Sequence, residues 1–216
     1  MIISNTTQNK ISFNARKVAI TQNVVKCKKT KINIFKLDSN DNALLENLKE
    51  KIDFQTLYTK LNEQQKTKIQ QIFEYCIYTS KFKEIETFIA ICGNKICGIL
   101  STNKLGTLRD INGICSIPVG QDKKVNLVGQ TLFYQIFNMA KREKLEKVAI
   151  EAVKDSPSNV VDRYKKLGFK SKDEGERYVT MEIDKYKISS QIRKLKKIIT
   201  FKEVNDKQSY DLNKYL

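Results

Sequence analysis

Two segments of this 216-residue sequence contain residues whose types and spacing could do chemistry. The first, residues 114–132 (ICSIPVGQDKKVNLVGQTL), has the pattern of a strand end, a loop and the start of a helix. The free backbone N–H groups and the positive dipole end of a helix start bind phosphate or pyrophosphate without a cationic side chain. Lys123 and Lys124 add positive charge at the same place. The segment is therefore a candidate phosphate site; the alternative is an ordinary solvated loop.

The second segment is a predicted helix that ends in a glycine. Ser156 is a typical N-cap with Pro157 at the first helical position, and Gly168 is a typical C-cap. Tyr164 lies one turn before this C-cap, and Phe169 turns the chain back toward the core. Without further context, such a tyrosine is usually a core residue whose hydroxyl reaches the surface.

The composition removes several kinds of chemistry. The chain has no His, which excludes Ser-His-Asp and Cys-His catalysis and His-containing zinc sites. No two cysteines form a Cys-x-x-Cys pair, so we predict no metal site. Four of the five lie in apolar runs, as reduced, buried thiols of a cytoplasmic protein do. The five are Cys27, Cys76, Cys92, Cys97 and Cys115.

Alternating and helical apolar patterns predict an α/β fold of the α+β kind, with one mixed sheet flanked by helices. The element order is β-α-α-β-β-β-α-β-α-β. Strands are predicted at 32–37, 87–92, 96–101, 108–117, 147–153 and 178–183. Helices are predicted from Asp41, over 63–82, over 127–143 and from Ser156 to Gly168.

The two ends of the chain are basic. Residues 1–31 carry seven Lys or Arg and no acid, and we predict a mobile leader there. Residues 32–184 form the predicted domain, and residues 185–216 a basic helix and tail. Apolar residues on one face of 187–201 predict a helix that docks on this domain or on a second subunit, as in a homodimer. The alternatives for this helix are a membrane surface or RNA, and no stretch is long enough to span a membrane.

With this element order, the late helix resembles that of the GNAT superfamily of acyl-CoA-dependent N-acyltransferases. The resemblance rests on Asn159 followed by Tyr164-Lys165-Lys166-Leu167-Gly168-Phe169, and it covers about residues 32–184. It implies that Tyr164 lies beside the sulfur of coenzyme A and protonates the departing thiolate. It also implies that Asn159 hydrogen-bonds the coenzyme arm. The strand ending Ser116-Ile117-Pro118 should splay from the next strand and pair with the pantetheine.

The same resemblance assigns the loop before the 127–143 helix to the pyrophosphate. In the best overlay Lys124 takes the basic position, Leu127 stands where the family has its first glycine, and Gly129 takes the second. Leu127 lacks the conformational freedom of glycine. The implied acetyl-CoA contacts are Ile117, Val119, Lys124, Val125, Asn126, Leu127, Val128, Gly129, Gln130, Asn159 and Tyr164.

A general base must remove a proton from the attacking amine, directly or through water. By strand alternation Asp110 shares a face with Asn112 and Ile114, and Asp110 is our preferred candidate. Glu86 and Glu151 are the other candidates, and a solvated strand residue is the alternative for Asp110.

These observations predict an N-acetyltransferase that moves an acetyl group from acetyl-CoA to a primary amine, with no metal. The alternative is an inactive GNAT-like module whose basic ends bind nucleic acid or an acidic partner. The net charge of +16 favours this alternative, but the charge is concentrated at the two ends. Arg, which usually reads phosphates in pairs of hydrogen bonds, is rare, so nucleic acid is not the favoured partner.

Overall fold

The computed structural model describes residues 15–25, 28–37, 41–206 and 208–215. They form one mixed sheet in the order β10-β1-β2-β3-β4-β5-β6-β8-β7, with β9 also paired to β1. The only parallel pair in the described sheet is β5–β6. The strands are β1 Ala15–Val25, β2 Lys28–Lys36, β3 Glu86–Cys92, β4 Lys95–Leu105, β5 Leu108–Ser116, β6 Lys147–Val153, β7 Lys170–Glu174, β8 Tyr178–Asp184, β9 Ile199–Glu203 and β10 Ser209–Tyr210.

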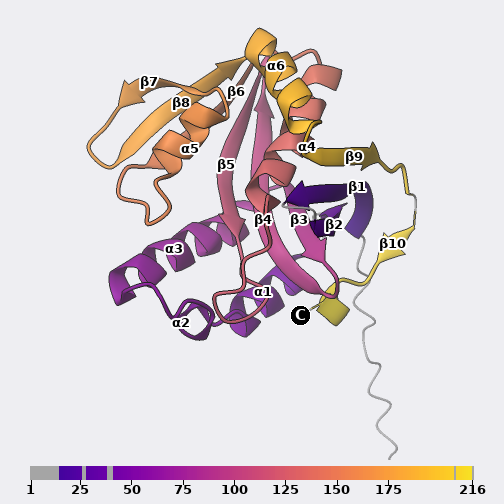
Figure 1. Ribbon diagram of the computed structural model, residues 1–216, viewed down its shortest axis with the longest axis vertical. Helices are drawn as coiled ribbons and strands as arrows, with labels where there is room; N and C mark the ends of the chain where they lie inside the picture. Colours follow the sequence, from indigo (N-terminus) through magenta and orange to yellow (C-terminus); the bar gives the residue numbers. More distant parts are fainter. Residues whose placement is uncertain (1–14, 26–27, 38–40, 207, 216) are drawn as a thin grey trace, which may run out of the picture.

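Helices cover both faces of this sheet, as the apolar patterns predict (Figure 1). They are α1 Asn42–Lys51, α2 Phe54–Leu57, α3 Glu63–Thr79, α4 Val128–Arg142, α5 Val160–Lys166 and α6 Lys185–Leu195, followed by a 3-10 turn at Asn213–Tyr215. Helices α1 to α3 pack on one face, where Ile89 and Ile91 of β3 point. Helices α4 and α6 pack on the other face, where Phe88 and Ala90 point. Strand β3 is buried on both faces along its middle and therefore reads as a nearly continuous apolar run.

The prediction of a mobile leader is wrong for the described part of residues 1–31. Ala15–Val25 forms β1, which lies between β2 and β9 in the sheet. Its inward side chains, Ala15, Ala19, Thr21 and Asn23, are almost fully buried. Two of these four are polar, so the strand has too weak an apolar alternation to be read from the sequence. Residues 1–14, and Cys27 with them, lie outside the described residues.

The basic C-terminal segment is built into the same fold. Ile188, Ile192 and Leu195 of α6 are buried against α4, which confirms a helix that docks on its own domain. The helix ends at Leu195 rather than at Phe201, because Ile199–Glu203 leaves it to pair with β1 as β9. Within the described residues, no helix combines the length and the apolar character needed to cross a membrane.

Two smaller predictions also need correction. Helix α5 begins at Val160 with Asn159 as its N-cap, and Ser156 instead belongs to a preceding turn in which the Asn159 N–H donates to the Ser156 carbonyl (3.0 Å). Of the cysteines described, Cys76, Cys97 and Cys115 are buried as expected, whereas Cys92 is only partly buried.

Candidate functional site

Strands β5 and β6 part in the middle of the sheet. Their parallel pairing runs from Leu108 and Lys147 to Ile111 and Ile150, and the described strands do not pair beyond that point. A β-bulge lies at the same place: Thr102 of β4 faces Ile111 and Ser101 faces Gly113, so Asn112 has no residue opposite it. Bulges bend a strand, which explains the divergence. The predicted splay therefore exists, and it begins before the end of β5.

The bulge also changes which residues share a face. Asp110 lies on the α3 side of the sheet, near Tyr75 of α3. Beyond the bulge, Gly113 is the residue that abuts α3, since a Cβ there would lie 2.6 Å from the Cys76 sulfur. The simple alternation that puts Asp110, Asn112 and Ile114 on one face is thus interrupted by the extra residue at 112.

A pocket of about 670 Å³ opens where the two strands part. Its walls come from α3, β5, β6, the α5 segment and the start of β8, between the α3 and α5–β8 parts of Figure 1. Among its lining residues are Ile72, Tyr75, Asn112, Glu151, Tyr164 and Tyr178. The splay, the tyrosine of the late helix and one candidate base thus share one cavity.

Tyr164 lies at the inner wall of this pocket and is 8% exposed. Its ring packs edge-on against Phe133 of α4, with centroids 5.4 Å apart, and lies 6.0 Å from Phe169. Burial raises the pKa of Tyr164 well above its ordinary value, and nearby Cys76 and Cys115 add to this effect. The phenol therefore keeps its proton at neutral pH, so it can donate a proton but is a poor base.

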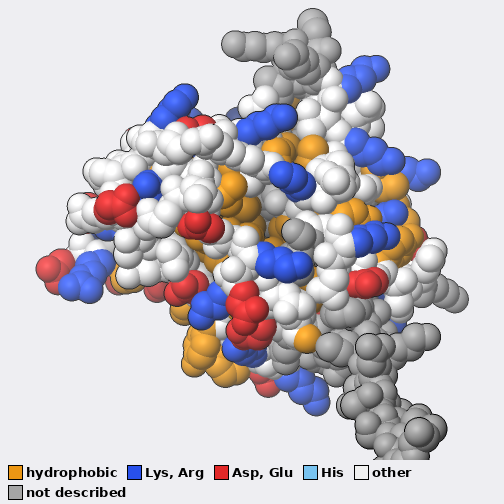
Figure 2. Space-filling view, turned by 90° about the horizontal axis from the view of Figure 1, so that it is seen from below, with side chains coloured by type: hydrophobic (Ala, Val, Ile, Leu, Met, Phe, Trp, Pro, Cys, Tyr) orange, Lys and Arg blue, Asp and Glu red, His pale blue; other side chains and the backbone are white. Residues whose placement is uncertain are grey.

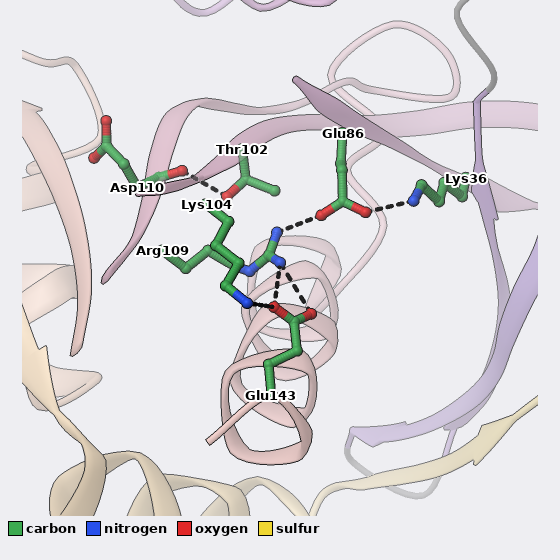
Figure 3. Close-up of polar contacts among 7 residues, drawn as sticks. All are labelled: Lys36, Glu86, Thr102, Lys104, Arg109, Asp110 and Glu143. Carbon is green, nitrogen blue, oxygen red and sulfur yellow. Dashed lines mark hydrogen bonds and ion pairs between the residues drawn. The ribbon is translucent and has the colours of Figure 1, made fainter. Parts of the chain in front are cut away.

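The three candidate bases lie in different places. Glu151 lines the pocket. Asp110 lies beside it, and burial together with the Glu151 carboxylate raises the pKa of Asp110 above its ordinary value. Its carbonyl oxygen accepts a hydrogen bond from the Thr102 hydroxyl (2.5 Å), whereas its carboxylate points away from Arg109 (Figure 3). Glu86 does not line the pocket.

Glu86 belongs to an ion-pair cluster on the α4 side of the sheet (Figure 3). It accepts hydrogen bonds from Lys36 and from Arg109, which is only 2% exposed. Arg109 also donates twice to Glu143 of the α4 C-terminus, at 2.7 and 2.9 Å. Burial raises the pKa of Glu86, but the hydrogen bonds from Lys36 and Arg109 outweigh this effect and bring the pKa below its ordinary value. Glu86 is therefore held in this cluster and does not line the pocket, so we do not retain it as a candidate base.

The candidate phosphate site is the start of α4. Leu127 is its N-cap and has a left-handed backbone conformation, φ 63° and ψ 18°. The next three N–H groups, of Val128, Gly129 and Gln130, have no partner within the helix. Gly129 leaves this helix start open, since a Cβ added there would have only the Ser116 hydroxyl, at 3.8 Å, within contact distance. Ser116 at the end of β5 and Gly129 in the first turn of α4 are thus neighbours.

The loop between them is held by its own contacts. The Val119 N–H donates to the Lys123 carbonyl (3.0 Å), and the Asp122 N–H donates to the Leu57 carbonyl (2.9 Å). The Lys124 ammonium lies over the Tyr58 ring, 5.4 Å from its centre, and the Lys124 side chain is exposed.

The remaining predicted contacts can offer less to a ligand. Ile117 is buried, and its N–H already donates to the Cys97 carbonyl (2.8 Å). Val119 and Val125 pack against the core, whereas Asn126 is exposed. The exposed Asn159 side chain donates to Asp162 of its own helix (2.7 Å) and does not line the pocket.

Sequence reasoning missed two aromatic residues of the pocket. Tyr75 and Tyr178 line it and are about half exposed, at 52% and 50%. A signal existed for Tyr75, because it lies outside the apolar stripe of α3 that packs on the sheet. Tyrosine is enriched at binding surfaces, because its ring is apolar and its hydroxyl can form hydrogen bonds.

The backbone of Leu127 supports a first prediction. At an ordinary helical position alanine is more stable than glycine, but a left-handed φ reverses this order. We expect the free energy of unfolding of Leu127→Gly to exceed that of Leu127→Ala by about 1 kcal/mol, since both variants lose the same leucine contacts. Urea unfolding measures the difference, and the same pair of changes at Lys141 of α4 should give the opposite order. Equal stabilities of the two Leu127 variants would contradict the assignment.

No protein-family model matches the sequence, and no curated protein matches it. Solved structures do match in fold. FdhC in its apo form, a nucleotide-linked sugar GNAT, aligns with a TM-score of 0.53 and 12% identity, over 87% of this chain and 99% of that one. PaiA N-acetyltransferase from Thermoplasma acidophilum, in complex with coenzyme A, aligns at 0.48 and 17%, over 71% and 98%. Spermidine N-acetyltransferase from Vibrio cholerae, in complex with CoA and spermine, aligns at 0.48 and 14%, over 73% and 98%.

The alignment with FdhC carries the fold assignment, since it covers nearly the whole of that protein and most of this one. The strand order and the parting of β5 and β6 are those that the resemblance of the late helix implies. The chain therefore has the GNAT fold.

Proposed function

We propose that this protein transfers an acetyl group from acetyl-CoA to a primary amine. The observation that carries the proposal is the buried Tyr164, a protonated phenol in the pocket where β5 and β6 part. The open start of α4 lies at the end of the same strand β5, where it could bind the pyrophosphate of the cosubstrate. The room beside Gly129, where a Cβ would meet only the Ser116 hydroxyl at 3.8 Å, supports a diphosphate at this helix start.

In the proposed reaction the amine nitrogen attacks the thioester carbonyl carbon. The oxyanion that develops is stabilised by backbone N–H groups of β5, beyond Ile111, where β6 no longer pairs with this strand. As the C–S bond breaks, Tyr164 donates its proton to the thiolate. Most of the rate enhancement comes from holding the two reactants together in the pocket.

Either Glu151 or Asp110 can accept the proton of the amine, directly or through water. Glu151 lines the pocket, and Asp110 has the raised pKa that makes a carboxylate a better base. We therefore keep both Glu151 and Asp110 as candidate bases.

The alternative of an inactive binding module has less support. The described parts of both basic ends contribute strands to the sheet, β1 and β9. On the face shown in Figure 2, Lys and Arg side chains are spread over the whole surface, with apolar side chains between them and acidic ones mainly on the left and below. A nucleic-acid surface usually gathers its basic residues on one face.

The experiment that tests the proposal is a calorimetric titration of acetyl-CoA into the full chain at moderate salt. We expect micromolar binding, and at least a roughly tenfold weaker affinity for Gly129→Glu, because a carboxylate would occupy the phosphate site. Gly175→Glu, which adds the same charge in the β7–β8 turn, is the matched control. The absence of heat and of any thermal shift with acyl-CoA would overturn the proposal.

A further inference from the structure

Leu127 holds a strained backbone conformation where the candidate phosphate site begins. A left-handed conformation costs a leucine about 1–2 kcal/mol, and it persists only where the surroundings enforce it. Contacts on either side of Leu127 must therefore hold the chain in this conformation.

The contacts point to Asn23, a residue of the first strand. Its side-chain nitrogen Nδ2 donates to the carbonyl oxygen of Asn126 (3.3 Å) and to the hydroxyl of Thr131 (3.0 Å). The Thr131 N–H in turn donates to the carbonyl of Leu127 (2.8 Å), which is the first hydrogen bond of α4. Asn23 thus holds the residue before Leu127 and the residue that closes the first helical turn after it.

Asn23 is itself held rigidly, as a residue that positions Asn126 and Thr131 must be. It is 1% exposed, and Thr131 is fully buried, so the contact is shielded from water. In the sheet Asn23 lies opposite Thr30 of β2 on one side and opposite Ile199 of β9 on the other. Its backbone is therefore fixed from both sides, and a buried amide has no competing water to bond.

We infer that Asn23 is a positioning residue for acetyl-CoA: it holds Leu127 in the conformation that a glycine would adopt unaided, and so aims the free N–H groups of α4 at the pyrophosphate. The inference rests on the proposed function. It gives the N-terminal strand, which lies about a hundred residues before the site, a part in binding the cosubstrate.

A double-mutant cycle tests this inference in the full chain. We expect Asn23→Ala to weaken acetyl-CoA binding about tenfold by calorimetry when residue 127 is leucine. In the Leu127→Gly background the same change should weaken binding less than about threefold, because glycine needs no support at this φ. Asn33→Ala, on the neighbouring strand β2, is the control and should leave the affinity unchanged.

Hydrogen exchange of the free protein gives a second, ligand-independent measurement. Asn23→Ala should speed exchange at Thr131, whose N–H closes the first turn of α4, and Asn33→Ala should not.

The outcomes separate the two proposals. If the unaltered protein does not bind acetyl-CoA, the proposed function fails. If it binds and Asn23→Ala binds equally well, or weakens binding equally in both backgrounds, the positioning role is wrong.

Discussion

Replacing Tyr164 by phenylalanine is expected to slow acetyl transfer roughly a hundred- to ten-thousand-fold, the range that a general acid typically contributes. Phenylalanine keeps the ring that packs against Phe133 and Phe169, so the fold and the affinity for acetyl-CoA should not change. Only the proton for the departing thiolate is lost. The measurement is the release of CoA thiol with a panel of primary amines, together with calorimetry of acetyl-CoA binding.

The matched control is Tyr186→Phe on α6, a tyrosine that is 78% exposed and does not line the pocket. This variant should keep full activity. Full activity in Tyr164→Phe, with an active unaltered protein, would show that the thiolate leaves without a proton from this residue and would remove Tyr164 from the mechanism.

The second large effect concerns stability. Glu143→Ala should lower the free energy of unfolding by about 3 kcal/mol, because it removes the carboxylate that accepts two hydrogen bonds from the buried Arg109. The guanidinium would keep Glu86 as a partner but would leave buried donors unpaired; its Nε already lacks a partner. Urea unfolding followed by circular dichroism measures the change.

A neighbouring ion pair provides the control. Arg142 pairs with Glu203 at 3.4 Å, but both side chains are more than half exposed. Glu203→Ala should therefore cost less than about 1 kcal/mol. If the two glutamate variants lose equal stability, the Arg109 cluster does not have the importance for the fold that its burial indicates.

The sequence determined the elements whose signal is local. The β3–β4 hairpin around Gly93 and Asn94, the strand Lys147–Val153 and the start of α4 at Val128 all follow from apolar periods and turn residues within a short window. The motif around Tyr164 is also local, because the glycine that follows the C-cap Leu167 and the aromatic residue after it lie within a few residues of the tyrosine. Short-range patterns of this kind depend on the geometry of one helix turn or one pleat.

Tertiary structure decided which acids reach the site. Glu86 and Glu151 each lie in or beside a predicted strand, and nothing local distinguishes them. The pairing of Glu86 with Arg109 and Lys36 and the opening of the pocket at Glu151 depend on which face of the sheet each strand presents. The bulge at Asn112, which sets that face beyond Ile111, is a property of two paired strands and not of one segment.

Strand β1 is the clearest example of an element that tertiary structure determines. Its sequence, ARKVAITQNVV, shows little apolar alternation, and its stability comes from pairing with β2 and with β9, whose residue Ile199 lies opposite Asn23. A contact between residues so far apart in the chain leaves no local pattern, because the partner strand supplies the hydrogen bonds and the burial. The sequence alone therefore determined where the helix end with Tyr164 and the start of α4 lie in the chain. The folded sheet determined that Asn23 contacts Asn126 and Thr131 at the start of α4.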